Sequence, residues 1–307
     1  DFIRTMHPND YPIVVADSAT LGQLRGRIPE KHLMEGNMRD IWIRDFGPIN
    51  TQKGVFKARY RPNYLSANDA RYIENGFLSF FRNLGVPYQN LDLVLDGGNF
   101  CYNGTDKAVI TERVFSDNSG KSEAQIRELL RSQLGINSVA FLPEEDGDTT
   151  GHSDGMVKWL SPTRIGVNEY FDAAFRNTVV LRLQAAFPGV EIVDIPWNPT
   201  NRVWRDFADG TGVYVNALTT PSAIYVPTYD LPTDAQAVQR ISSLADRQVI
   251  PIRVSQEIAI MGGAARCLSW QVSGASAQGI QVPGGGNGGG GGGGAVSYTH
   301  LTLPTRS

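Results

Sequence analysis

The hydrophobic pattern divides the chain into short apolar runs and longer amphipathic segments. Apolar runs of about four to eight residues that end at Gly, Pro, Asn or Asp are typical of strands, whereas apolar residues three and four positions apart predict helices. The predicted strands are 11–16, 38–50, 54–60, 91–95, 107–111, 138–142, 152–160, 164–168, 191–195, 213–216, 223–226, 249–253 and 257–261. The predicted helices are 68–84, 122–134, 171–187 and 234–245.

These elements recur in one order. The helices begin near residues 69, 122, 171 and 234, a spacing of roughly 50 to 60 residues with one strand–strand–helix–strand unit in each interval. Such repeats favour a ring of four or five α/β units with helices outside and one shared central cavity. Polar residues that follow the last strand of a unit would then face that cavity together. They are Asp96, His152, the segment 202–206 and Cys267.

Composition excludes several classes of function. A hydrophobic content of 41%, a charged content of 19% and a net charge of -3 describe an ordinary globular protein and favour neither nucleic acid nor an anionic membrane as partner. No apolar run is long enough to span a bilayer. The two cysteines are too few for a disulfide scaffold and lack zinc-site spacing. The sequence assigns neither a compartment nor an oligomeric state.

The C-terminal stretch differs from the rest of the chain. Residues 284–294 are glycine except for Asn287, and 295–307 follow without a hydrophobic period. Such a stretch buries too little apolar surface to offset its ordering entropy. We therefore expect one catalytic domain over residues 1–272 and a Gly-rich, disordered and partly non-native tail over 273–307.

Cys267 is the first candidate for chemistry. It follows Gly262 and Gly263, and paired glycines let the backbone approach a ligand closely. A thiol presented there is a nucleophile if a base or a positive field converts it to thiolate. The alternative is a buried structural cysteine, which is the more common case for a lone cysteine.

His152 and Asp154 form the second candidate. If 152–160 is a strand, residues two apart leave the same face, so both side chains point into one cavity. The chain has only four histidines, and His7, His32 and His300 lie in termini or loop-like surroundings. The alternative is a hydrogen-bonded structural pair.

Two further carboxylates are expected at strand ends. Asp45 precedes the turn Gly47-Pro48, and Asp96 precedes two glycines. Strand ends and the loops after them commonly carry working carboxylates, although either aspartate could instead cap its own turn. Arg59 and Arg61, two apart on a predicted strand, could hold a carboxylate with forked donors or could belong to a solvated edge strand.

Together these residues suit a planar cation. Several carboxylates can hold a guanidinium group through paired hydrogen bonds, and Asp45 and Asp154 would fix it. The positive charge of the substrate, with protonated His152, would stabilise the Cys267 thiolate. His152 would then protonate the departing ammonia and later activate water.

At this point five motifs resemble the agmatine deiminase and bacterial-type peptidylarginine deiminase family of guanidine-modifying enzymes. They are Trp42-x-Arg44-Asp45-x-Gly47-Pro48, Asp96-Gly97-Gly98-Asn99, Gly151-His152-x-Asp154, Asn216 before Tyr225-Val226-Pro227-Thr228, and Gly262-Gly263 ahead of Cys267. The resemblance implies a five-bladed α/β propeller and hydrolysis of a guanidine to a ureido group and ammonia without metal or cofactor.

The resemblance also implies roles. Cys267 falls on the nucleophile, His152 on the acid/base, and Asp45 and Asp154 on the pair that binds the guanidinium. Asp96, Asn216 and Trp42 fall on substrate-binding positions.

The substrate motifs point in two directions. One motif, Arg59-Tyr60-Arg61-Pro62-Asn63, resembles the peptidyl enzymes, in which such arginines hold the carboxylate of a C-terminal arginine. By contrast, Gly151 before His152 resembles the sequence of the agmatine enzymes at this position. The leading hypothesis is a deiminase that converts peptidyl or C-terminal arginine, or free arginine, to citrulline. The alternatives are an agmatine deiminase that forms N-carbamoylputrescine for putrescine biosynthesis, a non-catalytic binder of arginine-like cations, and a Cys-His-Asp acyl hydrolase. The expected partner is a small guanidine or an arginine-containing peptide.

Overall fold

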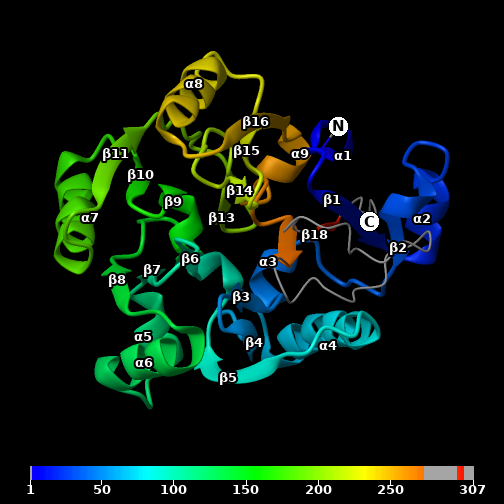
Figure 1. Ribbon diagram of the computed structural model, residues 1–307, viewed down its shortest axis with the longest axis horizontal. Coiled ribbons are helices and arrows are strands. Elements are labelled where there is room, and N and C mark those ends of the chain that lie inside the picture. Colours follow the sequence, from blue (N-terminus) through cyan, green and yellow to red (C-terminus); the bar gives the residue numbers. More distant parts are fainter. Residues whose placement is uncertain (1, 273–295, 301–307) are drawn as a thin grey trace.

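The computed structural model describes residues 2–272 and 296–300, and these form a mixed α/β fold of small sheets. Figure 1 shows the sheets arranged around a centre, with helices on the outside. Five sheets contain three or four strands, and the hairpin of β12 (Val203–Trp204) and β13 (Phe207–Ala208) forms a separate pair. The described part of the chain contains no helix that is both long and apolar enough to cross a membrane.

One connectivity recurs in these sheets. β3 (Ile49–Thr51) runs antiparallel to β4 (Gly54–Arg59), and β4 runs parallel to β5 (Gln89–Val94) after the crossover helix α4 (Ala67–Asn83). Parallel neighbours need such a crossover, whereas antiparallel neighbours need only a turn. The hydrophobic pattern of the sequence predicts such a helix in each repeated unit.

Three further units follow the same plan. The second contains β6 (Cys101–Tyr102), β7 (Lys107–Thr111), α5 (Arg113–Asp117), α6 (Glu123–Leu129), a π-helical turn at Leu130–Leu134 and β8 (Ser138–Leu142). The third contains β9 (Val157–Ser161), β10 (Arg164–Asn168), α7 (Ala173–Ala186) and β11 (Glu191–Ile195). The fourth contains β14 (Leu218–Thr219), β15 (Ala223–Thr228), α8 (Asp234–Leu244) and β16 (Gln248–Arg253).

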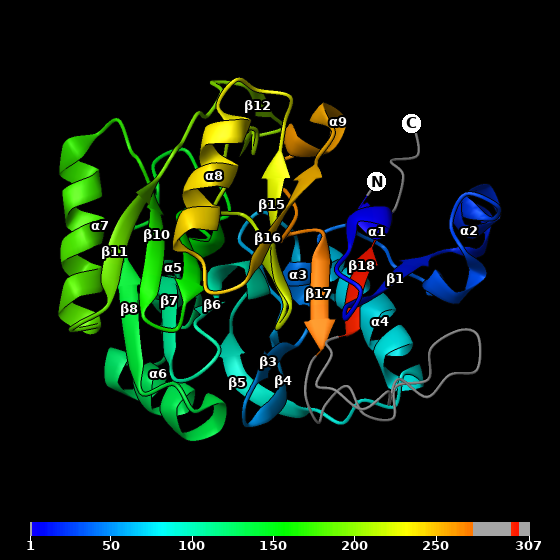
Figure 2. The ribbon, with the colours of Figure 1, turned by 45° about the horizontal axis from the view of Figure 1, so that its top comes forward.

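The remaining sheet joins the two ends of the chain. β17 (Ser269–Val272) runs antiparallel to β18 (Val296–His300), which is parallel to β1 (Tyr11–Ala16), and β1 is parallel to β2 (Leu33–Glu35) after α2 (Ser18–Leu24). Figure 2 shows β17 beside β18 and β1. The short helix α1 (Phe2–Thr5) precedes this sheet.

The predicted tail falls mostly outside the described residues, which do not include 273–295 and 301–307. The prediction of an unfolded tail does not hold for β18. This strand has no hydrophobic period, but its backbone pairs on both sides, with β17 and with β1. Backbone pairing satisfies the N–H and C=O groups of two strand edges, a gain that side-chain periodicity does not report.

The cores lie between the sheets and the outer helices. Under α4, Phe77 and Phe81 pack edge-on against Trp270 of β17, with ring centroids 6.0 and 5.4 Å apart. The helix begins at the N-cap Ser66, whose hydroxyl accepts a hydrogen bond from the Asp69 N–H. Each fully buried aromatic ring contributes roughly 1.5–3 kcal/mol through apolar burial. This core therefore ties the last inner strand to the first unit.

Four predicted strands are corrected by the structure. Segment 38–50 contains the helical turn α3 (Ile43–Phe46) before β3, and 257–261 contains the helix α9 (Gln256–Ala259) and a turn. Segment 213–216 is a turn before β14, and 152–160 becomes a strand only at Val157, after a 3-10 turn at Ser153–Gly155. Short apolar runs of this kind do not separate strand from helix by periodicity alone.

These corrections reveal a regular placement of the polar residues. Six of the predicted pocket residues lie just before the first strand of a unit and not on the strand itself. Asp45 precedes β3, Asp96 precedes β6, His152 and Asp154 precede β9, Asn216 precedes β14, and Cys267 precedes β17. Figure 1 shows β3, β6, β9 and β14 nearest the centre. The segment 202–206 instead belongs to the β12–β13 hairpin, where Arg202 forms an ion pair with Asp209.

Candidate active site

His152 lies between two carboxylates. Its Nε2 is 3.3 Å from Asp96 Oδ2 and its Nδ1 is 3.7 Å from Asp45 Oδ1, and the ring is almost completely buried. Burial disfavours the charged ring, but Asp45 and Asp96 outweigh burial and raise the pKa of His152 to about 10. The imidazole is therefore protonated at neutral pH and can donate a proton.

Asp45 is held by the turn α3 and by a glycine of the neighbouring unit. The Gly98 N–H donates a hydrogen bond of 3.2 Å to Asp45 Oδ1. A Cβ at position 98 would overlap His152 Nδ1 and would lie 2.7 Å from Asp45 Oδ1, so only glycine fits. Burial raises the pKa of Asp45 to about 7, although the charge of His152 lowers it.

A second group of buried polar residues surrounds Cys267. We call this group and the residues around His152 together the pocket. Its Sγ is 3.1 Å from Asn216 Nδ2 and 3.8 Å from Asp154 Oδ2. Burial, followed by the negative charges of Asp154 and Asp45, raises the pKa of the Cys267 thiol well above its ordinary value. In the resting protein the sulfur is therefore a neutral thiol.

Asn216 orients the segment that carries the cysteine. Its Oδ1 accepts hydrogen bonds from the backbone N–H groups of Arg266 (3.2 Å) and Cys267 (3.4 Å). Its backbone carbonyl accepts a second bond from the Arg266 N–H, at 3.1 Å. Asn216, predicted at the site, therefore lies beside Cys267 and contacts the segment that carries it.

Trp42 forms a wall beside Cys267. A Cβ on Gly263 would come within 2.5 Å of Trp42 Cζ3 and 3.0 Å of Cys267 Cβ. The indole and the cysteine therefore approach the same glycine from two sides. Because Gly263 has no side chain, the segment that carries Cys267 can pass close to this ring.

Asp154 is held by a residue that the sequence analysis did not assign. Arg266 donates a hydrogen bond of 2.6 Å from Nη1 to Asp154 Oδ2, and its Nη2 donates to the Phe100 carbonyl at 2.7 Å. The Arg266 side chain is 12% exposed and that of Asp154 is 3% exposed. The sequence signal that could have identified Arg266 is its position directly before Cys267.

The two halves of the pocket interact electrostatically. Asp45 and Asp154 both act on the pKa values of His152 and of Cys267. Asp96 Oδ1 is buried and has no hydrogen-bond partner within the described residues, which leaves an acceptor for a ligand. The pocket thus combines a neutral thiol, an imidazolium and three buried aspartates.

The predicted arginine clamp lies at the surface. Arg59 and Arg61 are both exposed, so neither belongs to the buried cluster. Arg59 forms an ion pair with Asp92 at 2.9 Å, and Arg61 Nη2 lies 3.4 Å from the Asp117 carbonyl oxygen. The charges of both Arg61 and Asp96 act on the pKa of Asp117, the residue whose carbonyl oxygen Arg61 approaches.

This arrangement suits a cationic substrate. A guanidinium has five N–H donors in a plane, and it would bring a positive charge to three carboxylates and a thiol. Within residues 2–272 and 296–300, no group of three or more His, Cys, Asp and Glu side chains is arranged to hold a metal ion.

Comparisons with known proteins identify relatives of this chain. The agmatine deiminase of Pseudomonas aeruginosa (strain LESB58) is 25% identical, over 85% of this chain and 82% of its own length, and that of Medicago truncatula is 23% identical, over 84% and 83%. Two solved structures share the fold, each over 83% of this chain. They are a putative arginine deiminase from Porphyromonas gingivalis (TM-score 0.68, 23% identity, 82% of that chain) and the agmatine deiminase of C. jejuni (TM-score 0.68, 18% identity, 80% of that chain).

The model of one protein family matches nearly all of the described residues. The match, to the Porphyromonas-type peptidyl-arginine deiminases, runs over residues 1–273 and includes every residue of the pocket. The chain therefore belongs to the Porphyromonas-type peptidyl-arginine deiminase family, whose members are hydrolases of the C–N bonds of guanidine groups.

Proposed function

We propose that this protein is a cysteine-dependent deiminase that hydrolyses the guanidinium group of an arginine derivative to a ureido group and ammonia. One observation carries the proposal: a neutral thiol, Cys267, and a protonated imidazole, His152, share the field of the same buried aspartates. We also propose that the five repeated sheets are the blades of an α/β propeller, because each places its pocket residues before its first strand.

The substrate cation supplies the charge that the resting pocket lacks. Asp45 and Asp154 hold the guanidinium, and Asp96 Oδ1 accepts one of its N–H groups, since that oxygen has no partner within the described residues. A positive charge beside Cys267 offsets the aspartates that raise the pKa of its thiol. The thiol proton then leaves to solvent, and the thiolate forms only when substrate is bound.

The first half of the reaction breaks the C–N bond. The Cys267 thiolate attacks the guanidinium carbon, forms a C–S bond and neutralises the cation. His152 donates its proton to one amino nitrogen, and that nitrogen leaves with the C–N electron pair as ammonia. The product is a positively charged amidino thioether on Cys267.

The second half regenerates the enzyme. Neutral His152 takes a proton from water, and the hydroxide adds to the thioether carbon. Collapse of this adduct breaks the C–S bond, the departing Cys267 sulfur takes the hydroxyl proton of the adduct and becomes a neutral thiol again, and a ureido group is left. Asp45 and Asp96 favour the protonated form of His152 at both stages, because they flank its two ring nitrogens.

For the substrate, we propose an arginine with a free carboxylate, peptide-linked or free. Arg61 supports this choice. It is exposed, its guanidinium approaches the Asp117 carbonyl, and it forms no ion pair in the described part of the chain. Arg59 contributes only if substrate displaces Asp92 from its guanidinium. Agmatine is the second candidate, favoured by the names of the relatives, and it has no carboxylate for Arg61 to hold.

Ammonia release tests the proposal. Agmatine, free arginine, and peptides with internal or C-terminal arginine are assayed with the wild type and with Cys267→Ala. Cys101→Ala is the matched control, because Cys101 is an equally buried thiol that does not precede a first strand. We expect release with the wild type and Cys101→Ala only. Release that survives Cys267→Ala rejects the mechanism, and no release from any compound favours a binding protein.

A further inference from the structure

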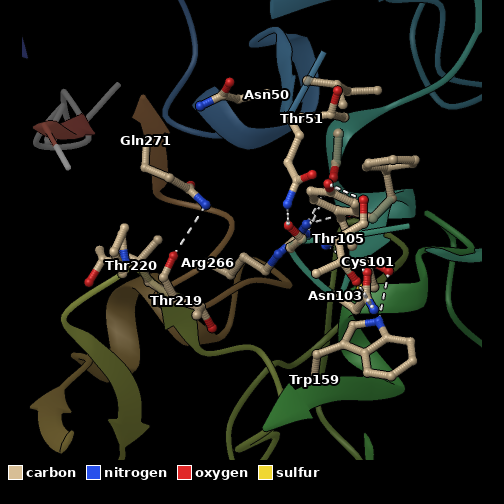
Figure 3. A pocket seen from close by; sticks show the side chains of 18 of the residues that line it. Asn50, Thr51, Cys101, Asn103, Thr105, Trp159, Thr219, Thr220, Arg266 and Gln271 are labelled. Carbon is tan, nitrogen blue, oxygen red and sulfur yellow. Dashed lines mark hydrogen bonds between the residues drawn. The ribbon is translucent and has the colours of Figure 1, made fainter. Parts of the chain in front are cut away.

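A second cavity lies at the opposite end of the inner strands from Cys267. Its volume is about 790 Å³, and Figure 3 shows it from close by. The pocket residues precede β3, β6, β9, β14 and β17, whereas this cavity is lined by the turns that follow four of those strands. Those turns are at residues 52–53, 103–105, 162 and 220–221. We call it the rear cavity.

The charged residues that line the rear cavity are all cationic. Five cationic residues line it, and no Asp or Glu of the described part of the chain does so. They are Arg44, Lys53, Lys158, Arg247 and Arg266. Neutral donors and acceptors, including Asn103 and Gln271, complete the wall (Figure 3). This composition is the reverse of that around Cys267, where three aspartates are buried.

Two of these cations are buried without a carboxylate. Arg44 is 8% exposed and Lys158 is 7% exposed, and neither has an Asp or Glu oxygen within 4.0 Å among residues 2–272. Arg44 Nη2 donates to Gln271 Oε1 at 2.5 Å, and Lys158 Nζ donates to the Ala217 carbonyl. Neutral acceptors satisfy hydrogen bonds but do not neutralise charge, and a buried unpaired cation is costly.

The cations also repel one another. Burial, followed by the charge of Arg266, lowers the pKa of Arg44 to about 9, and the charges of Asp154, Cys267 and Asp45 offset only part of this effect. The same two causes, in the same order, lower the pKa of Lys158 well below its ordinary value, and Arg44 adds to the effect. Three cations from α3, β9 and the segment before β17 therefore lie within electrostatic reach of one another. A bound anion would relieve this repulsion.

We propose that the rear cavity is a second ligand site that binds a small molecule carrying phosphate or carboxylate groups. Oxyanion oxygens would accept charge-assisted hydrogen bonds from Arg44 and Lys158, and Arg247 would attract the ligand at the wall. The site is separate from the guanidinium pocket: Arg266, whose guanidinium holds Asp154, forms part of the partition between them.

Binding is tested by calorimetric titration of the wild type with inorganic phosphate, pyrophosphate and succinate, each at constant ionic strength set with NaCl. We expect saturable binding of at least one ligand, and the comparison of phosphate with succinate distinguishes the two anion classes. Lys158→Met is expected to weaken that binding by at least about tenfold, since it removes one charge-assisted hydrogen bond. Lys121→Met removes an equal charge from Lys121, which pairs with Asp92 and does not line the cavity, and should bind like the wild type.

Arg247→Gln keeps the test decisive if Lys158→Met does not fold. The Arg247 side chain is 25% exposed at the wall, and we expect this change to weaken anion binding by severalfold. Absence of saturable binding of all three anions to the folded wild type overturns the proposal. Binding that is unchanged in Arg247→Gln and in folded Lys158→Met would also overturn it. Neither result bears on ammonia release, so the two proposals fail separately.

Discussion

The guanidinium of Arg266 donates a 2.6 Å hydrogen bond to Asp154, and this pair lies directly beside Cys267. The aspartate expected to hold a substrate guanidinium is therefore already in contact with one from the chain itself. Because both partners are buried, the pair sets the charge near the sulfur and anchors the segment before β17.

Removal of Arg266 should be costly for stability. Arg266→Met leaves Asp154 buried and unpaired, and breaking such a pair is expected to lower the free energy of unfolding by about 3–5 kcal/mol. Urea unfolding measures the change. Arg253→Met is the matched control, because the exposed Arg253–Asp230 pair should contribute little. If both variants lost the same free energy of unfolding, the buried Arg266–Asp154 pair would contribute no more to stability than the exposed pair.

The thiol of Cys267 should resist ionisation until substrate binds. Burial and the charges of Asp154 and Asp45 raise its pKa, so the ultraviolet absorbance of thiolate should be absent at neutral pH. The difference spectrum between the wild type and Cys267→Ala isolates this group. Asp154→Asn should lower the pKa of the thiol by removing one negative charge. A thiolate signal in the free wild type at neutral pH would contradict this prediction.

His152 should make stability depend on pH. Its pKa is raised from 6.5 to about 10 in the folded protein, so its contribution is complete below 6.5 and is lost as pH rises through about 10. Denaturant midpoints of the wild type should fall across this window. His152→Gln should have a flatter profile there, because glutamine has no proton to lose. Parallel pH profiles of the wild type and His152→Gln would show that Asp45 and Asp96 do not raise the pKa of the His152 ring.

Gly98 should tolerate no side chain. A Cβ there would overlap His152 Nδ1 and crowd Asp45 Oδ1, so Gly98→Ala should lower kcat by at least about 100-fold through displacement of the acid/base. Gly22→Ala is the control: nothing lies within 4 Å of a Cβ at that position in α2. That change should stabilise the protein by about 0.5–1 kcal/mol and leave kcat unchanged. Normal turnover in Gly98→Ala would refute the described geometry.

Arg61 should act on carboxylate-bearing substrates alone. Arg61→Ala is expected to raise KM for arginine and for C-terminal arginine peptides by about tenfold, because one charge-assisted hydrogen bond is lost. Values for agmatine should not change. Arg59→Ala should have a smaller effect, since Arg59 already pairs with Asp92. An equal loss on agmatine would reject the clamp.

The sequence predicted best those elements whose pattern is local. Strand β7 and helix α4 have a clear period and defined ends, and both were found within a residue or two of their predicted bounds. Asp45 and Cys267 were expected on or after strands, but α3 and α9 occupy those segments. Each of these helices is a single turn of four residues, too short to show the period on which such predictions depend.

The contacts between the pocket residues could be identified only from the structure. Asp45 and Asp154 were expected to hold one guanidinium together. The sequence did not predict that Asp45 lies with Asp96 around His152, or that Asp154 contacts Arg266. Arg266 and Asp154 are 112 positions apart, so no local pattern reports their contact. The same holds for Arg44 and Lys158, whose shared cavity arises only when separate units meet.

The covalent step is the central claim, and intact-mass spectrometry of enzyme acid-quenched during turnover tests it most directly. We predict a mass increase equal to the substrate amidine, located by peptide mapping on the fragment with Cys267, and accumulated further when His152→Gln slows hydrolysis. An unmodified Cys267 in every quenched sample, with ammonia released at the normal rate, would contradict the account.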